Sequence, residues 1–75
     1  MKDTVILDVR EFHERGEEPF TAIMDAVDGL AQNQSLLLIN SFEPVPLYAV
    51  MKRRGFTYRC SAEGPEEYHV FFSRP

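Results

Sequence analysis

The stretches Val5-Ile6-Leu7-Asp8-Val9-Arg10 and Leu36-Leu37-Leu38-Ile39-Asn40 decide the fold of this chain. Each stretch is an apolar run of strand length, and each is followed by an acid-proline step, Glu18-Pro19 or Glu43-Pro44, that opens a helical pattern. Proline suits the first position of a helix because the N–H that it lacks would have no intrahelical partner there. The repetition therefore predicts two successive strand-helix units.

Hydrophobic periodicity predicts six elements in all. They are strands over 4–9, 35–40, 56–61 and 67–73, and helices over 19–30 and 44–54. In the first helix, one stripe of side chains is expected to face the core: Phe20, Ile23, Met24, Val27 and Leu30. The second helix is expected to turn Leu47, Val50 and Met51 inward and to end at Gly55. The segment 13–17 is expected to be a solvated connector.

Strand-helix-strand units cross over with a right hand, so two of them place both helices on the same side of a sheet. The tight connection 62–66 makes the last pair of strands antiparallel. The sequence thus predicts one domain over residues 1–75. Its fold is a two-layer α/β sandwich of order β-α-β-α-β-β, with a mixed four-stranded sheet and two helices on one face.

Such a sandwich leaves the other face of the sheet without helices. The second strand is apolar on both faces, because Leu37 and Ile39 alternate with Leu36 and Leu38. Leu37 and Ile39, together with Ile6 and Phe71, are expected to form an exposed apolar surface on the helix-free face. This surface is expected to dock a protein partner or a second copy of the chain. The alternative is that the last strands and their tyrosines cover this face.

Composition excludes several classes of protein. The 75-residue chain carries a net charge of −4, and its main basic cluster, Lys52-Arg53-Arg54, ends a predicted helix, where the helix dipole favours cations. Nucleic acid is therefore not an expected partner. No apolar run is long enough to span a membrane, and the expected location is cytoplasmic. Cys60 is the only cysteine, which excludes an internal disulfide.

The carboxyl ends of the first two strands are where ligands bind in open α/β sheets. Polar residues that could bind a ligand gather there: Asp8, Arg10, His13, Glu18, Asn40, Ser41 and Glu43. The alternative is that they only cap helices and pair with one another, as Asp8 would with Arg10 or a backbone N–H. A metal could use His13 with Glu18 or Glu43, but so few ligands predict neither a metal nor a cofactor. Ser41 with His13 matches no catalytic motif, so no catalytic residue is assigned.

The two junctions and the segment Arg54-Gly55-Phe56 together resemble domain-of-unknown-function family 2249, over nearly the whole chain. The resemblance implies a relation to the TusA/SirA sulfur-carrier fold, with strand order 1-2-4-3. It also suggests a setting in redox, metal-centre or nitrogen-oxide physiology, without assigning a reaction.

TusA-type carriers begin their first helix with Cys-Pro, whereas this chain has Glu18-Pro19. A carboxylate cannot carry a persulfide, so sulfur transfer of that kind is not expected. Many relatives have a histidine where this chain has Phe42. Cys60 and His69 are expected to be structural. The leading hypothesis is a non-enzymatic accessory or interaction domain, and the alternative is a small-ligand or metal-binding module at loops 10–18 and 40–46.

Overall fold

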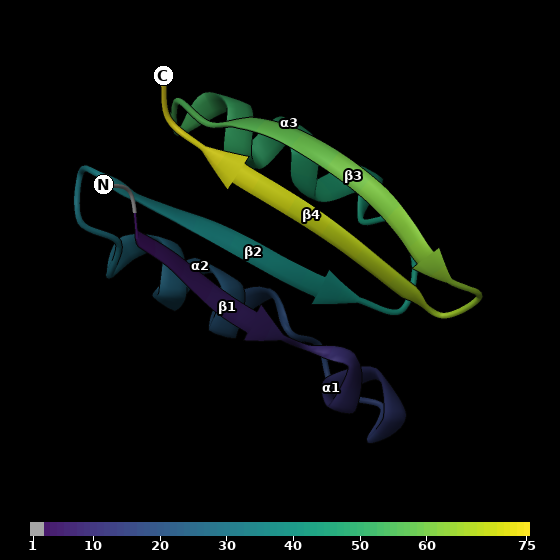
Figure 1. Ribbon diagram of the computed structural model, residues 1–75. Helices are drawn as coiled ribbons and strands as arrows, with labels where there is room; N and C mark the ends of the chain where they lie inside the picture. The colour runs from purple at the N-terminus through teal and green to yellow at the C-terminus, as the bar shows by residue number, and fades with distance from the viewer. Residues whose placement is uncertain (1–2) are drawn as a thin grey trace.

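The computed structural model describes residues 3–75 as one sheet backed by helices (Figure 1). The elements in chain order are β1 (Asp3–Asp8), α1 (Arg10–Glu14), α2 (Phe20–Asp28), β2 (Gln34–Asn40), α3 (Val45–Arg53), β3 (Thr57–Gly64) and β4 (Glu67–Ser73). The two predicted strand-helix units and the final pair of strands are all present. No helix among the described residues is long and apolar enough to cross a membrane.

The sheet has the strand order β1-β2-β4-β3, as the family resemblance implied. β1 pairs with β2 in parallel, so both strands end at the same edge of the sheet. β4 pairs antiparallel with both β2 and β3. β2 is therefore a central strand, which explains why its side chains are apolar on both faces.

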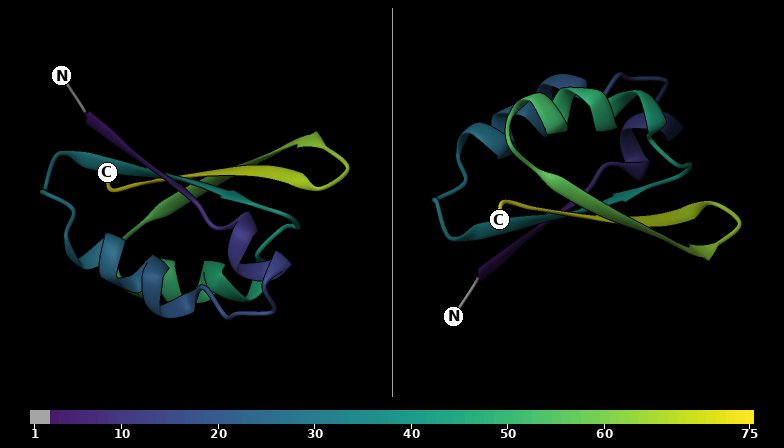
Figure 2. Two further views of the ribbon diagram at one scale, coloured as in Figure 1. Left: turned by 90° about the horizontal axis from the view of Figure 1, so that it is seen from below. Right: turned by 90° about the horizontal axis from the view of Figure 1, so that it is seen from above.

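Both long helices lie on one side of the sheet, as Figure 2 shows from two directions. The fold is thus the predicted two-layer sandwich. Leu36 and Leu38 of β2 and Val70 and Phe72 of β4 point to the helices and are fully buried. The rest of the core comes mainly from the two helices and the ends of the strands: Val9, Ile23, Met24, Val27, Leu47, Tyr48, Met51 and Phe56.

The expectation of a connector over 13–17 was wrong at its start, because α1 covers Arg10–Glu14. This helix is hardly more than one turn long, so it has no hydrophobic period that the sequence could reveal. Phe12 of α1 is partly buried and packs against the core. Gly16, at φ 71°, ends the turn; its N–H donates to the His13 carbonyl, and the N–H of Glu17 donates to that of Phe12.

Two further expectations need correction. Phe20 was predicted to face the core, but it is 45% exposed, because it lies in the first turn of α2 beside an open groove. The hairpin connection is shorter than predicted, because β3 continues to Gly64 through an irregularity in its pairing between Ala62 and Gly64. Cys60, which was expected to be structural, is half-buried.

Candidate functional site

The seven candidate residues follow β1 and β2 at the edge where these parallel strands end. The structure divides them between two hollows. His13, Glu18 and Asn40 line a largely apolar groove, whereas Asp8, Arg10 and Ser41 line a charged pocket. Glu43 lines neither hollow and instead binds Tyr48. The segment between β1 and α2 reaches both hollows, because α1 carries Arg10 at its start and His13 at its end.

The groove lies at the start of α2 and α3 and has a volume of about 440 Å³. This volume is within the range of small-molecule sites. Its wall combines three polar residues with eight apolar ones: His13, Glu18 and Asn40 with Pro19, Phe20, Ile23, Phe42, Pro44, Pro46, Leu47 and Val50. Phe20 and Phe42 are about half exposed, so the groove presents apolar surface to solvent.

His13 is one of the three polar residues that line this groove. Its Nε2 lies 2.7 Å from Oδ1 of Asn40, whose Nδ2 donates to the carbonyl of Phe42 at 3.0 Å. The ring of Phe42 packs against the imidazole, with 4.9 Å between the ring centroids. Asn40 is 3% exposed, so two hydrogen bonds satisfy a buried amide and orient the histidine.

Glu43 accepts a hydrogen bond from the Tyr48 hydroxyl at 2.9 Å. The phenol ring of Tyr48 is stacked on that of Tyr58, with 3.7 Å between the centroids. Burial raises the pKa of Tyr48 well above its usual range, and the neighbouring Cys60 thiol and Glu43 carboxylate add to the effect. Glu43 is thus paired with a side chain of α3, and it does not cap this helix, whose start has no side-chain cap hydrogen bond.

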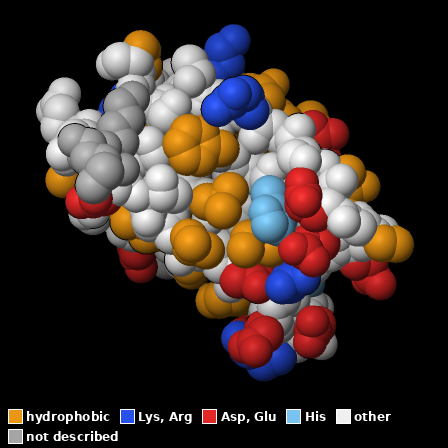
Figure 3. All heavy atoms as spheres, viewed as in Figure 1, with side chains coloured by type: hydrophobic (Ala, Val, Ile, Leu, Met, Phe, Trp, Pro, Cys, Tyr) orange, Lys and Arg blue, Asp and Glu red, His pale blue; other side chains and the backbone are white. Residues whose placement is uncertain are grey.

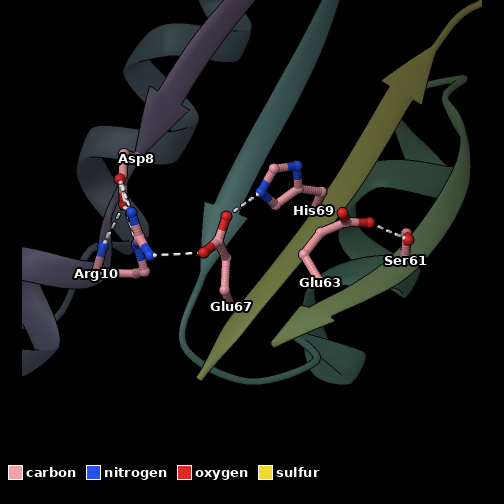
Figure 4. Close-up of polar contacts among 6 residues, drawn as sticks. All are labelled: Asp8, Arg10, Ser61, Glu63, Glu67 and His69. Carbon is pink, nitrogen blue, oxygen red and sulfur yellow. Dashed lines mark hydrogen bonds and ion pairs between the residues drawn. The ribbon is translucent and has the colours of Figure 1, made fainter. Parts of the chain in front are cut away.

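The charged pocket is organised around Arg10 (Figure 4). Its backbone N–H and Nε donate to Asp8 Oδ1, and Nη2 donates to Asp8 Oδ2 at 2.7 Å. These hydrogen bonds lower the pKa of Asp8. Nη1 lies 3.3 Å from Glu67 Oε1, and Glu67 Oε2 lies 2.7 Å from His69 Nε2. The predicted pairing of Asp8 with Arg10 is confirmed, and the chain of contacts to β4 was not expected from the sequence.

The helix-free face of the sheet carries the predicted apolar residues. Ile6, Leu37 and Phe71 lie in one row across β1, β2 and β4, with Arg59 of β3 at its end, where the guanidinium lies 5.9 Å from the Phe71 ring centroid. Ile6 is 65% exposed. Leu37, Ile39 and Phe71 are half-buried. Figure 3 shows hydrophobic side chains at the middle of this face and charged ones toward its lower end.

No group of three or more His, Cys, Asp or Glu side chains within residues 3–75 is arranged to hold a metal ion. His13 and Glu18 share the groove, but Glu43 is turned to Tyr48. Ser41 lines the charged pocket rather than the groove, so His13 is not paired with it as a base with a nucleophile.

Sequence reasoning found the polar residues of the groove but missed its apolar walls. Phe20, Phe42 and Val50 stand near Pro19, Pro44 and Pro46 in the sequence, and a proline-rich start to both helices was visible. That signal could have indicated apolar side chains without a place in the core. The pairing of α2 and α3 across the groove depends on the tertiary packing and leaves no local pattern.

The chain matches one family model, described as "Uncharacterized conserved protein (DUF2249)", over residues 6–74. The match confirms the family resemblance. The relation to sulfur carriers stays a prediction. No curated protein matches the chain. No solved structure matches it either.

Proposed function

We propose that this chain, which belongs to the DUF2249 family of uncharacterized proteins, is a non-enzymatic binding module whose ligand occupies the groove at the starts of α2 and α3. The observation that carries the proposal is the groove itself. A hollow of about 440 Å³ that is lined by eight apolar residues and three polar ones has the usual composition of a small-molecule site.

The state of His13 supports binding over catalysis. The imidazole is committed through Nε2 to the buried Asn40 amide, which orients it. A hydrolytic role would need a nucleophile or an activated water next to that ring, and Ser41, the nucleophile considered from the sequence, lines the other hollow. A rigidly held polar group among apolar walls is suited to selecting a ligand and fixing its orientation.

Nuclear magnetic resonance titration tests the proposal. Isotope-labelled protein is titrated with a panel of small aromatic and aliphatic compounds, and amide shifts are followed. We expect saturable shifts at Phe20, Ile23 and Val50. Phe20→Ala should weaken binding several-fold, while Ile6→Ala, which truncates an exposed apolar side chain on the sheet face, should leave it unchanged. If no compound shifts these amides, the groove is not a ligand site.

A second function is favoured by the helix-free face, where Ile6 is 65% exposed beside Leu37 and Phe71. We propose that this row binds a second copy of the chain. A two-fold arrangement that packs this face on itself would bury Ile6, Leu37 and Phe71 of both copies, and exposed apolar surface of this kind often marks an interface. Sedimentation should then give a weak dimer that Ile6→Asp abolishes. A monomer at millimolar concentration would rule the dimer out.

A further inference from the structure

We propose that the ligand of the groove joins an apolar body to a cationic amine, which binds between His13 and Glu18. This inference rests on the proposed function, since it names the class of ligand for the same groove. The apolar body would lie along the walls formed by Phe20, Phe42 and Val50. The amine would donate hydrogen bonds to His13 and Glu18.

The first step concerns which ring nitrogen of His13 carries the proton. Asn40 Nδ2 donates to the Phe42 carbonyl, so Asn40 turns its carbonyl oxygen Oδ1 to His13. Because Oδ1 can only accept, His13 Nε2 must be the donor of that hydrogen bond. In the neutral ring, the second nitrogen, Nδ1, is then unprotonated and accepts hydrogen bonds. Within residues 3–75, no side chain or backbone group donates to it.

The second step concerns charge. Glu18 is the only charged residue among those that line the groove in the described part of the chain. The nearest arginine in sequence, Arg15, is already paired with Glu17 at 3.0 Å and with Glu11 at 3.5 Å. The lining of the groove thus combines a carboxylate with an imidazole acceptor. This combination complements an ammonium group, which has three donors and a positive charge.

The third step excludes an anion. A helix start can bind anions through free N–H groups, and the groove adjoins the start of α3. Pro44 and Pro46 have no N–H, however, and the N–H groups of Val45 and Leu47 donate to the carbonyls of Glu43 and Pro44. These four residues at the start of α3 therefore offer no amide to an anion. Glu18 at the start of α2 would repel one.

The fourth step excludes a metal ion as the ligand. A transition metal would need at least three protein donors, and no such group is found in residues 3–75. One carboxylate and one imidazole are too few. They are sufficient for a single ammonium group, which needs hydrogen-bond acceptors but no fixed coordination geometry.

Three matched probes test the inference: phenethylamine, phenethyl alcohol and 3-phenylpropionate. They share an aromatic body and differ in the charge of the head group, and each is titrated into labelled protein at about pH 8, where an alkylamine is protonated and a carboxyl group is ionised. We expect the amine to bind about fivefold or more tighter than the alcohol, and the carboxylate to bind weakest. In Glu18→Gln, the advantage of the amine over the alcohol should fall to within about twofold. Glu17→Gln is the matched control, because Glu17 is adjacent but paired with Arg15, and it should keep the full advantage.

The outcomes separate this inference from the proposed function. Equal binding of the amine and the alcohol, or tightest binding of the carboxylate, overturns the inference and leaves the groove as a ligand site. Failure of all three probes to shift the groove amides, when a broad panel also fails, overturns both. The amide spectrum of Glu18→Gln verifies that the variant is folded.

Discussion

His13 and Asn40 are joined by a hydrogen bond of 2.7 Å although 27 residues separate them in the chain. The bond connects the short helix α1 to the end of the central strand β2. The bond thereby attaches the segment between β1 and α2 to the end of β2. The amide of Asn40 has two partners, His13 and the Phe42 carbonyl, so a single buried side chain fixes both loops that border the groove.

We therefore predict that Asn40→Ala destabilises the protein by about 1–3 kcal/mol, because it removes a buried amide that makes two hydrogen bonds, to the Phe42 carbonyl and to His13 Nε2. Urea denaturation measures the change in the free energy of unfolding. Asn33→Ala is the control, since Asn33 is exposed and should tolerate the change within about 0.5 kcal/mol. A loss below about 0.5 kcal/mol for Asn40→Ala would mean that water replaces the two hydrogen bonds.

The faces of the central strand give a second prediction. Leu38 is fully buried under the helices, whereas Ile6 on the neighbouring strand points to the other side and is 65% exposed. Leu38→Ala should cost about 2–5 kcal/mol through lost apolar contacts and the cavity left behind. Ile6→Ala should cost less than about 0.5 kcal/mol. Chemical denaturation of both variants compares them directly, and similar losses would contradict the assignment of the two faces.

These faces could be predicted from the sequence because a strand alternates with a period of two residues. Leu36 and Leu38 were separated from Leu37 and Ile39 by that rule, and the structure has the same division, with the first pair fully buried and the second half-buried. The order of the strands followed from the family resemblance and is confirmed. Helix α1 was missed because five residues are too few to display a period.

The candidate site was predicted only as a set of residues at one edge of the sheet. Its division into a groove and a charged pocket depends on α1, which turns Arg10 and His13 to different sides. The link from Arg10 through Glu67 to His69 crosses from α1 to β4 and requires the strand order β1-β2-β4. Such contacts leave no trace in local spacing, so sequence patterns could not reveal them.

Tyr48 gives a prediction on pH dependence. Burial, followed by the Cys60 thiol and Glu43, raises its pKa in the folded protein, whereas in the unfolded chain a tyrosine ionises near pH 10. Below about pH 10, both states hold the proton and stability is unaffected. As pH rises further, only the unfolded state loses the proton, so stability falls.

Denaturation between about pH 7 and about pH 11 tests this prediction. The unfolding free energy should decline above about pH 10 in the native sequence and decline less steeply in Tyr48→Phe. That variant loses the hydrogen bond to Glu43 and should be about 1 kcal/mol less stable at neutral pH. Tyr58→Phe is the control, since Tyr58 is 40% exposed and should keep the alkaline slope. Equal slopes in the native protein and Tyr48→Phe would show that this hydroxyl titrates freely.

The last prediction concerns the residue that ends α3. Gly55 has φ 88°, a left-handed conformation, and its N–H donates to the Lys52 carbonyl. A Cβ at this position would meet no atom within 4 Å, so any loss in Gly55→Ala comes from the backbone and not from a clash. We expect a loss of about 1 kcal/mol, because alanine is strained in the left-handed region.

Gly29 ends α2 at φ −86°, an ordinary right-handed value, and is the matched control. Gly29→Ala should be neutral or slightly stabilising, since alanine reduces the freedom of the unfolded chain. Thermal or urea denaturation of the two variants measures the difference, and an equal effect at both positions would show that the left-handed turn after α3 relaxes at no cost.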